Sequence, residues 1–151
     1  MRVFKDDRAR PGYEFAENGH SRNALAVFNV LQPELARAPK DTNPFELIAF
    51  PFFAACAYYA EATDDGAARD FEGGIRIAVW AHSIGAGCTD GEAKAITEEV
   101  FTTMARISLL KAQGEDTIEA LAEEPSDQML EWISGALLKA EGAVKALALR
   151  G

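Results

Sequence analysis

The sequence has few of the residues that most often carry catalysis or bind metal ions. It contains two cysteines and two histidines, Cys56, Cys88, His20 and His82, and none of them lies at the close spacing that zinc sites use. It shows no disulfide framework, signal peptide or lipidation motif, which predicts a reduced, cytoplasmic location. We therefore expect no metal ion and no cofactor.

A phosphate-binding loop, a catalytic motif and a nucleic-acid signature are also absent. The formal net charge is -9, and it is unevenly distributed: residues 1–40 hold seven Lys or Arg and five Asp or Glu, whereas residues 41–151 hold eight and nineteen. An acidic body repels nucleic acid and anionic membranes. We expect neither as a partner, and the lack of catalytic motifs favours a non-enzymatic protein.

Prolines are scarce, six against 28 alanines, and long gaps between turn signals favour helices over a many-stranded sheet. A chain of 151 residues is long enough to bury one continuous core. The predicted fold is all-α, a single-domain helical bundle of about five to seven helices over residues 21–151. An irregular N-terminal arm, residues 1–20, precedes it.

The longest apolar stretch runs from Asn43 to Thr63 and is predicted to be a buried central helix. Asn43 can cap it, Pro44 suits the first helical position, and Glu46 stands three residues after the cap. Pro51 cannot donate a backbone hydrogen bond, so we expect a bend or a break there. A membrane span is the competing interpretation, but the nearly continuous apolar residues run only from Phe45 to Ala60, which is shorter than the roughly 20 residues that a bilayer requires.

Capping and turn signals divide the rest of the chain into further helices. Ser21 is predicted to cap a helix that ends near Leu31, and Thr89 with Glu92 forms a capping box for a helix that ends near Gln113. Two C-terminal helices are predicted over residues 116–124 and 126–149. Residues 74–82 fit either a helix or a strand, and we favour a helix because a lone strand would leave its backbone unpaired.

Cys88 is the one candidate nucleophile. It lies just before the predicted helix start at Thr89, where the helix dipole favours a thiolate, and His82 stands six residues earlier. The pair predicts, as one alternative function, a thiol-dependent enzyme or redox sensor. A structural role is the simpler interpretation, because no orienting carboxylate or oxyanion hole is evident nearby.

A small-ligand or metal-binding helical bundle is the second alternative function. Four side chains are candidates to line a ligand pocket: Tyr58, Tyr59, Trp80 and His82. In addition, the turn Asp90-Gly91-Glu92 resembles the acidic interhelical turns of the tellurite-resistance TerB-like helical proteins. The resemblance covers only a few residues, and the turn lacks the alternating acids of a calcium-binding loop, so it assigns no metal ligands.

The strongest functional indication is a run of acidic residues without any Lys or Arg: Glu115, Asp116, Glu119, Glu123, Glu124, Asp127 and Glu131. An unbalanced negative surface attracts a basic protein over a long range. We therefore expect an acidic protein-binding or regulatory protein that uses this surface, the N-terminal arm or both. The last helix also carries Leu130, Trp132 and Leu138 outside its main apolar stripe, which indicates burial on two sides or a homo-oligomer.

Overall fold

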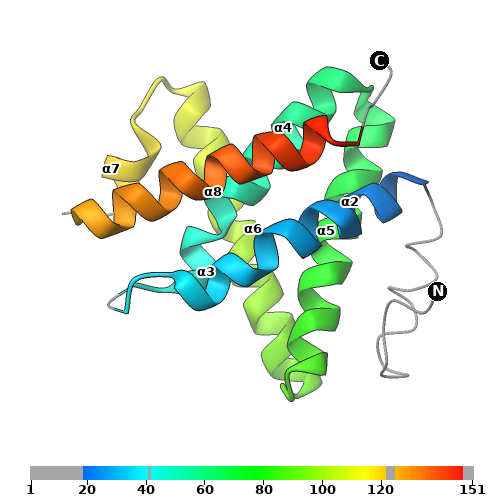
Figure 1. Ribbon diagram of the computed structural model, residues 1–151, viewed down its shortest axis with the longest axis horizontal. Helices are drawn as coiled ribbons and strands as arrows, with labels where there is room; N and C mark the ends of the chain where they lie inside the picture. Colours follow the sequence, from blue (N-terminus) through cyan, green and yellow to red (C-terminus); the bar gives the residue numbers. More distant parts are fainter. Residues whose placement is uncertain (1–18, 41, 122–124, 148–151) are drawn as a thin grey trace.

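The computed structural model describes residues 19–40, 42–121 and 125–147, and these form helices joined by loops, without a strand among them. The all-α class is therefore confirmed. The predicted N-terminal arm lies outside the described residues except for its last two. In chain order the elements are α2 (Gly19–Leu31), the 3-10 helix η2 (Gln32–Arg37), α3 (Pro44–Leu47), α4 (Ala49–Ala62), α5 (Asp65–Gly85), α6 (Asp90–Ala112), α7 (Thr117–Leu121) and α8 (Asp127–Lys145) (Figure 1).

The helix α2 begins at Gly19, two residues before the predicted cap. Ser21 is fully buried inside the helix, and its hydroxyl donates to the carbonyl of Asp70 on α5 at 3.5 Å. The first turn is held instead by a tertiary contact, because the ring nitrogen Nδ1 of His20 lies 2.7 Å from the Tyr59 hydroxyl on α4. The prediction of Ser21 as a cap was wrong, since its side chain packs against a neighbouring helix.

The predicted central helix is divided into α3 and α4, and the break lies at Ile48 rather than at Pro51. Asn43 caps α3 as expected, with its Oδ1 accepting from the Phe45 amide at 3.0 Å. Pro51 is the third residue of α4, where a backbone amide has no partner within the helix, so the missing donor costs no hydrogen bond. The interruption that Pro51 predicted therefore occurs one turn earlier in the chain.

Residues 74–82 lie within the continuous helix α5, so the strand alternative was wrong. Gly87, after α5, has a φ of +101°, a left-handed conformation that favours glycine. The capping box of α6 is formed as predicted. The Glu92 amide donates to the Thr89 hydroxyl at 3.1 Å, and the Thr89 amide donates to the Glu92 carboxylate at 2.8 Å.

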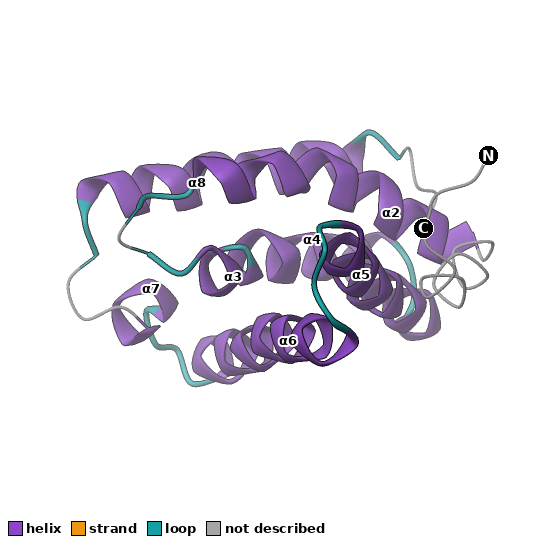
Figure 2. Ribbon diagram, turned by 90° about the horizontal axis from the view of Figure 1, so that it is seen from below, coloured by secondary structure: helices purple, strands orange, loops and turns teal. Residues whose placement is uncertain are grey.

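The α3–α4 segment lies between two helices that cover it from opposite sides. Figure 2 shows α8 on one side and α6 on the other, and α4 packs against both and against α5. The core along α4 is aromatic: Tyr59 stacks on Phe71 of α5 with ring centroids 4.1 Å apart, and Phe52 stacks on Phe28 of α2 at 5.9 Å. All four side chains are buried, so α4 joins α2 and α5 through the core.

The helix α8 runs beside α2 (Figure 1) and is tied to the residues that follow α2. Trp132, expected outside the main apolar stripe, is buried, and its indole nitrogen donates to the Glu34 carbonyl at 3.0 Å. The Glu34 carboxylate is also buried and forms ion pairs with Arg37, at 3.0 Å, and with Lys139 of α8.

At its start α8 follows the prediction, with the Ser126 hydroxyl accepting from the Met129 amide at 3.1 Å. It ends at Lys145 rather than near Leu149, which lies outside the described residues. Leu130 and Leu138 remain exposed, so the expected contact with a second copy of the chain stays a prediction.

By length and composition alone, one segment of the described chain, Pro44–Ala62, could cross a membrane. An 18-residue window of it is 44% buried within the molecule, and the core helix of a soluble protein meets the same criterion. Packing of α4 against α5, α6 and α8 accounts for part of its apolar surface.

Candidate functional site

The predicted acidic surface lies at one end of the molecule, which holds the turn after α6, the short helix α7 and the start of α8 (Figure 1). Two of its seven members, Glu123 and Glu124, lie outside the described residues. The other five are all exposed: Glu115, Asp116, Glu119, Asp127 and Glu131. We call these five residues the acidic surface.

None of these five carboxylates forms an ion pair with a described lysine, arginine or histidine. Asp116 has a local role, because its Oδ1 caps α7 by accepting from the amides of Ile118, at 3.0 Å, and Glu119, at 3.1 Å. Asp127 lies in the first turn of α8, where a negative charge is favoured by the helix dipole. The negative charge at this end is therefore not neutralised within the described chain.

A cavity of about 280 Å³ lies beneath α7, between α3, α6 and α8. Its apolar lining comes from Leu47 and Phe50 of the α3–α4 segment, from Ile118 and Leu121 of α7, and from Met129 and Ile133 of α8. The acidic surface and this cavity thus share α7 and α8, which provide acids to solvent and apolar side chains to the interior.

Polar groups line the other side of the cavity: Thr42, Asn43 and Glu46 near α3, and Thr103 and Arg106 on α6. The Asn43 amide donates to the Glu99 carboxylate, and the buried Thr103 hydroxyl donates to the Glu99 carbonyl at 2.9 Å. The first bond joins the start of α3 to α6, and the second lies within α6.

The four side chains predicted to line a ligand pocket lie on two helices that pack together, α4 and α5. Tyr59 is fully buried, and its hydroxyl is used by His20 and Asn23, the latter donating at 2.9 Å. Tyr58 points to α8, where its hydroxyl donates to Glu141 at 3.3 Å. None of the predicted four lines the cavity beneath α7.

His82 lies farther along α5. Its ring packs on Phe28, with centroids 5.7 Å apart. Phe71, the stacking partner of Tyr59, precedes His82 by eleven residues on α5, a separation of about 16 Å along a helix. Trp80, on the same helix, is half-buried.

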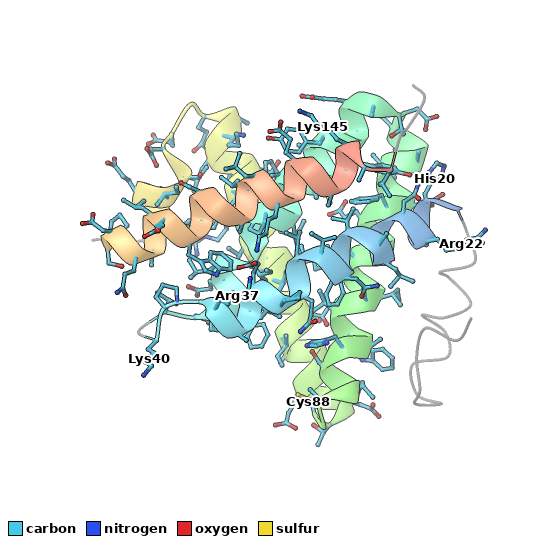
Figure 3. The ribbon with its side chains drawn as sticks, in the orientation of Figure 1. His20, Arg22, Arg37, Lys40, Cys88 and Lys145 are labelled. Carbon is cyan, nitrogen blue, oxygen red and sulfur yellow. The ribbon has the colours of Figure 1, made fainter. Side chains whose placement is uncertain are left out.

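Cys88 lies in the turn between α5 and α6, away from α7 and the start of α8 (Figure 3). Its amide donates to the Ser83 carbonyl at 3.1 Å, and no hydrogen bond joins its thiol to His82 among the described contacts. Burial lowers the pKa of His82, which keeps its ring neutral at neutral pH. The described contacts therefore do not include the thiolate–imidazolium pair that the thiol alternative requires.

The second cysteine, Cys56, is half-buried on α4. Burial, with a smaller contribution from the Glu72 carboxylate, raises the pKa of Cys56 to about 12, so its thiol stays protonated. Within the described ranges, no three His, Cys, Asp or Glu side chains come together in an arrangement that could hold a metal ion.

Comparison with known proteins finds no family model, no curated protein and no solved structure that matches the chain. The likeness of Asp90-Gly91-Glu92 to TerB-like turns therefore remains that of a single turn. In the structure this turn is the first turn of α6, and Glu92 completes its capping box.

The sequence indicated none of the residues that line the cavity as site residues, and Glu46 and Arg106 are the two charged ones among them. They are 60 positions apart in the chain, and each resembles an ordinary exposed charge on a helix. Only the packing of α3 on α6 places both at one cavity.

Proposed function

We propose that this chain is a non-enzymatic protein-binding module, and that its acidic surface engages a basic region of a partner protein. One observation carries the proposal: five exposed carboxylates are gathered on α7, the turn before it and the start of α8, without an ion pair in the described chain. Charges that are not neutralised internally remain available to a partner, and they steer its approach over about 8 Å at physiological salt.

The contacts around Cys88 and His82 do not favour the thiol alternative, because the two groups are not hydrogen-bonded and His82 packs on an apolar ring. The metal-binding alternative is not favoured either, because no three His, Cys, Asp or Glu side chains of the described ranges come together in an arrangement that could hold a metal ion. The N-terminal arm, the other predicted binding segment, lies outside the described residues, so the proposal is placed on the acidic surface alone.

The test uses two triple variants that raise the net charge equally. The first, Glu115→Gln, Glu119→Gln and Glu131→Gln, neutralises the acidic surface while Asp116 and Asp127 stay at their helix starts. The matched control, Glu61→Gln, Glu72→Gln and Glu98→Gln, neutralises three exposed acids on α4, α5 and α6. Each immobilised protein is used to capture partners from a cell extract at low salt, and the captured partner is then purified and its Kd measured.

We expect the first variant to bind the purified partner about tenfold more weakly, because each of the three exposed charge pairs contributes roughly 0.5 kcal/mol to binding. The control should bind within about twofold of the natural chain, and affinity should fall between about 50 and 300 mM salt. Equal losses in both variants would mean that net charge alone matters. If the first variant binds as tightly as the natural chain and the affinity does not change with salt, the acidic surface is ruled out as the binding site.

A further inference from the structure

We propose that the cavity beneath α7 binds a small apolar α-amino acid in its zwitterionic form, with the size of leucine. The proposal concerns the interior lined by α3, α6, α7 and α8, and it does not depend on protein binding at the acidic surface. It rests on the shape of the cavity, on its apolar wall and on two opposite charges at its polar side.

The volume sets the size of the ligand. A volume of about 280 Å³ is sufficient for a ligand of roughly the size of leucine. Drug-sized ligands occupy larger pockets, of about 300–1,000 Å³. The cavity therefore suits a compact metabolite rather than a cofactor or a nucleotide.

The wall formed by α4, α7 and α8 sets the nature of the ligand's side chain. Phe50 and Ile133 are buried, while Ile118, Leu121 and Met129 are half-buried around the same space. An aliphatic side chain placed there would be removed from water, which favours binding in proportion to the apolar area covered. Glycine or a polar amino acid would gain little from this wall.

The polar side sets the charges of the ligand. Glu46 on α3 and Arg106 on α6 both line the cavity and are both exposed, but they form no ion pair with each other or with another described residue. The Asn43–Glu99 hydrogen bond joins the start of α3 to α6, so the two helices that carry these charges are held side by side. A carboxylate suits the forked guanidinium of Arg106, and an ammonium group suits Glu46.

A ligand with only one charge would satisfy only half of this arrangement. A simple carboxylate would pair with Arg106 but face Glu46 and the nearby acidic surface, and a simple amine would pair with Glu46 but face Arg106. A zwitterion places both of its charges beside opposite ones. Thr103 adds a hydroxyl whose proton already points to the Glu99 carbonyl, which leaves its oxygen to accept from an ammonium group.

The test is isothermal titration calorimetry with four probes, L-leucine and three compounds that each differ from it at one group. They are L-leucine, 4-methylpentanoate, which lacks the amine, L-leucinamide, which lacks the carboxylate, and glycine, which lacks the side chain. We expect L-leucine to bind at least about tenfold more tightly than each of the other three.

Two exposed substitutions assign the charges. Glu46→Gln should abolish the preference for L-leucine over 4-methylpentanoate, and Arg106→Gln should abolish the preference over L-leucinamide. The controls Glu61→Gln and Arg69→Gln change exposed charges on α4 and α5 away from the cavity lining and should leave both preferences intact. The acidic-surface triple variant should still bind L-leucine, which separates this proposal from the previous one.

The proposal would be overturned by the absence of saturable L-leucine binding up to about 10 mM. It would equally be overturned by equal affinities for the four probes, or by Glu46→Gln and Arg106→Gln variants that keep the natural chain's preferences. Far-ultraviolet circular dichroism of each variant establishes that it remains helical.

Discussion

Gly74 shows how a single hydrogen atom in place of a side chain sets the packing of two helices. A Cβ atom added at Gly74 would lie 2.7 Å from the Ala24 Cβ atom and 3.0 Å from the Ser21 Cα atom, both on α2. Such distances are too short for carbon atoms in contact, so α2 approaches α5 at this point because no side chain intervenes. By contrast, nothing lies within 4 Å of a Cβ atom added at Gly142 on α8.

We expect Gly74→Ala and Gly142→Ala to change stability in opposite directions. The first should destabilise the fold by about 1–3 kcal/mol, because the two helices must move apart. The second should stabilise it by about 0.5–1 kcal/mol, because alanine restricts the unfolded chain and favours the helix. Urea unfolding of both variants measures the difference. Equal changes would show that helix propensity, and not the contact with α2, decides the outcome at Gly74.

At the same scale, the acidic surface could be predicted because its residues are neighbours in the chain and no basic residue lies among them. The cavity could not, because Glu46 and Arg106 come from separate helices. Two of the aromatic residues expected at a pocket have other contacts in the structure: Tyr59 fills the core against Phe71, and Tyr58 faces α8.

At the scale of the helices, local signals determined most of the predicted starts. Asn43, Thr89 and Ser126 each satisfy an amide two or three residues ahead, so four or five consecutive residues were sufficient to place these ends. The start of α2 and the break at Ile48 were missed because they depend on distant groups. Gly19 and His20 join α2 through the contact of His20 with Tyr59, which no local pattern contains.

The capping box of α6 gives a direct test of a local signal. Replacing Thr89 by alanine removes the hydroxyl that accepts from the Glu92 amide, and we expect a loss of about 1 kcal/mol in the free energy of unfolding. Thr102→Ala, at an exposed position inside the same helix, is the control and should cost nothing. Chemical unfolding at neutral pH compares the two, and similar stabilities would contradict a role for the cap.

The stability that the capping box contributes also depends on pH, and the direction of this dependence follows from the pKa of Glu92. The hydrogen bonds from Thr89 hold the pKa of Glu92 below its ordinary value. The contribution of the ionised carboxylate is therefore present above the unfolded pKa of about 4.5 and is lost as pH falls through the lowered value.

At the scale of the whole molecule, Glu34 and α8 connect regions that are far apart in the chain. The Glu34 side chain is only 9% exposed, and Lys139, 105 residues later, is one of its two ion-pair partners. A carboxylate in this position needs its partners, because an unpaired buried charge is costly. Lys145, on the same helix, pairs with Glu141 on the surface instead.

These two lysines form a matched pair of substitutions. We expect Lys139→Met to destabilise the protein by about 1.5–3 kcal/mol, since it removes a charged hydrogen bond from a buried carboxylate. Lys145→Met removes an exposed pair and should cost at most about 0.5 kcal/mol. Thermal unfolding at low and high salt distinguishes them, because only the exposed pair is fully screened. A larger loss for Lys145→Met would contradict the burial of the Glu34 contact.

The position of α8 also has a consequence for the way the chain is made. The hydrogen bond between Trp132 and the Glu34 carbonyl spans 98 residues, and α8 covers both α2 and α4. During synthesis the amino-terminal helices emerge first, and their apolar faces stay uncovered until the ribosome has made this last helix. Closing so long a loop carries an entropic cost, which delays the final docking. The newly made chain therefore passes through a stage in which the faces of α2 and α4 that α8 covers are open to other molecules, and the docking of α8 ends that exposure.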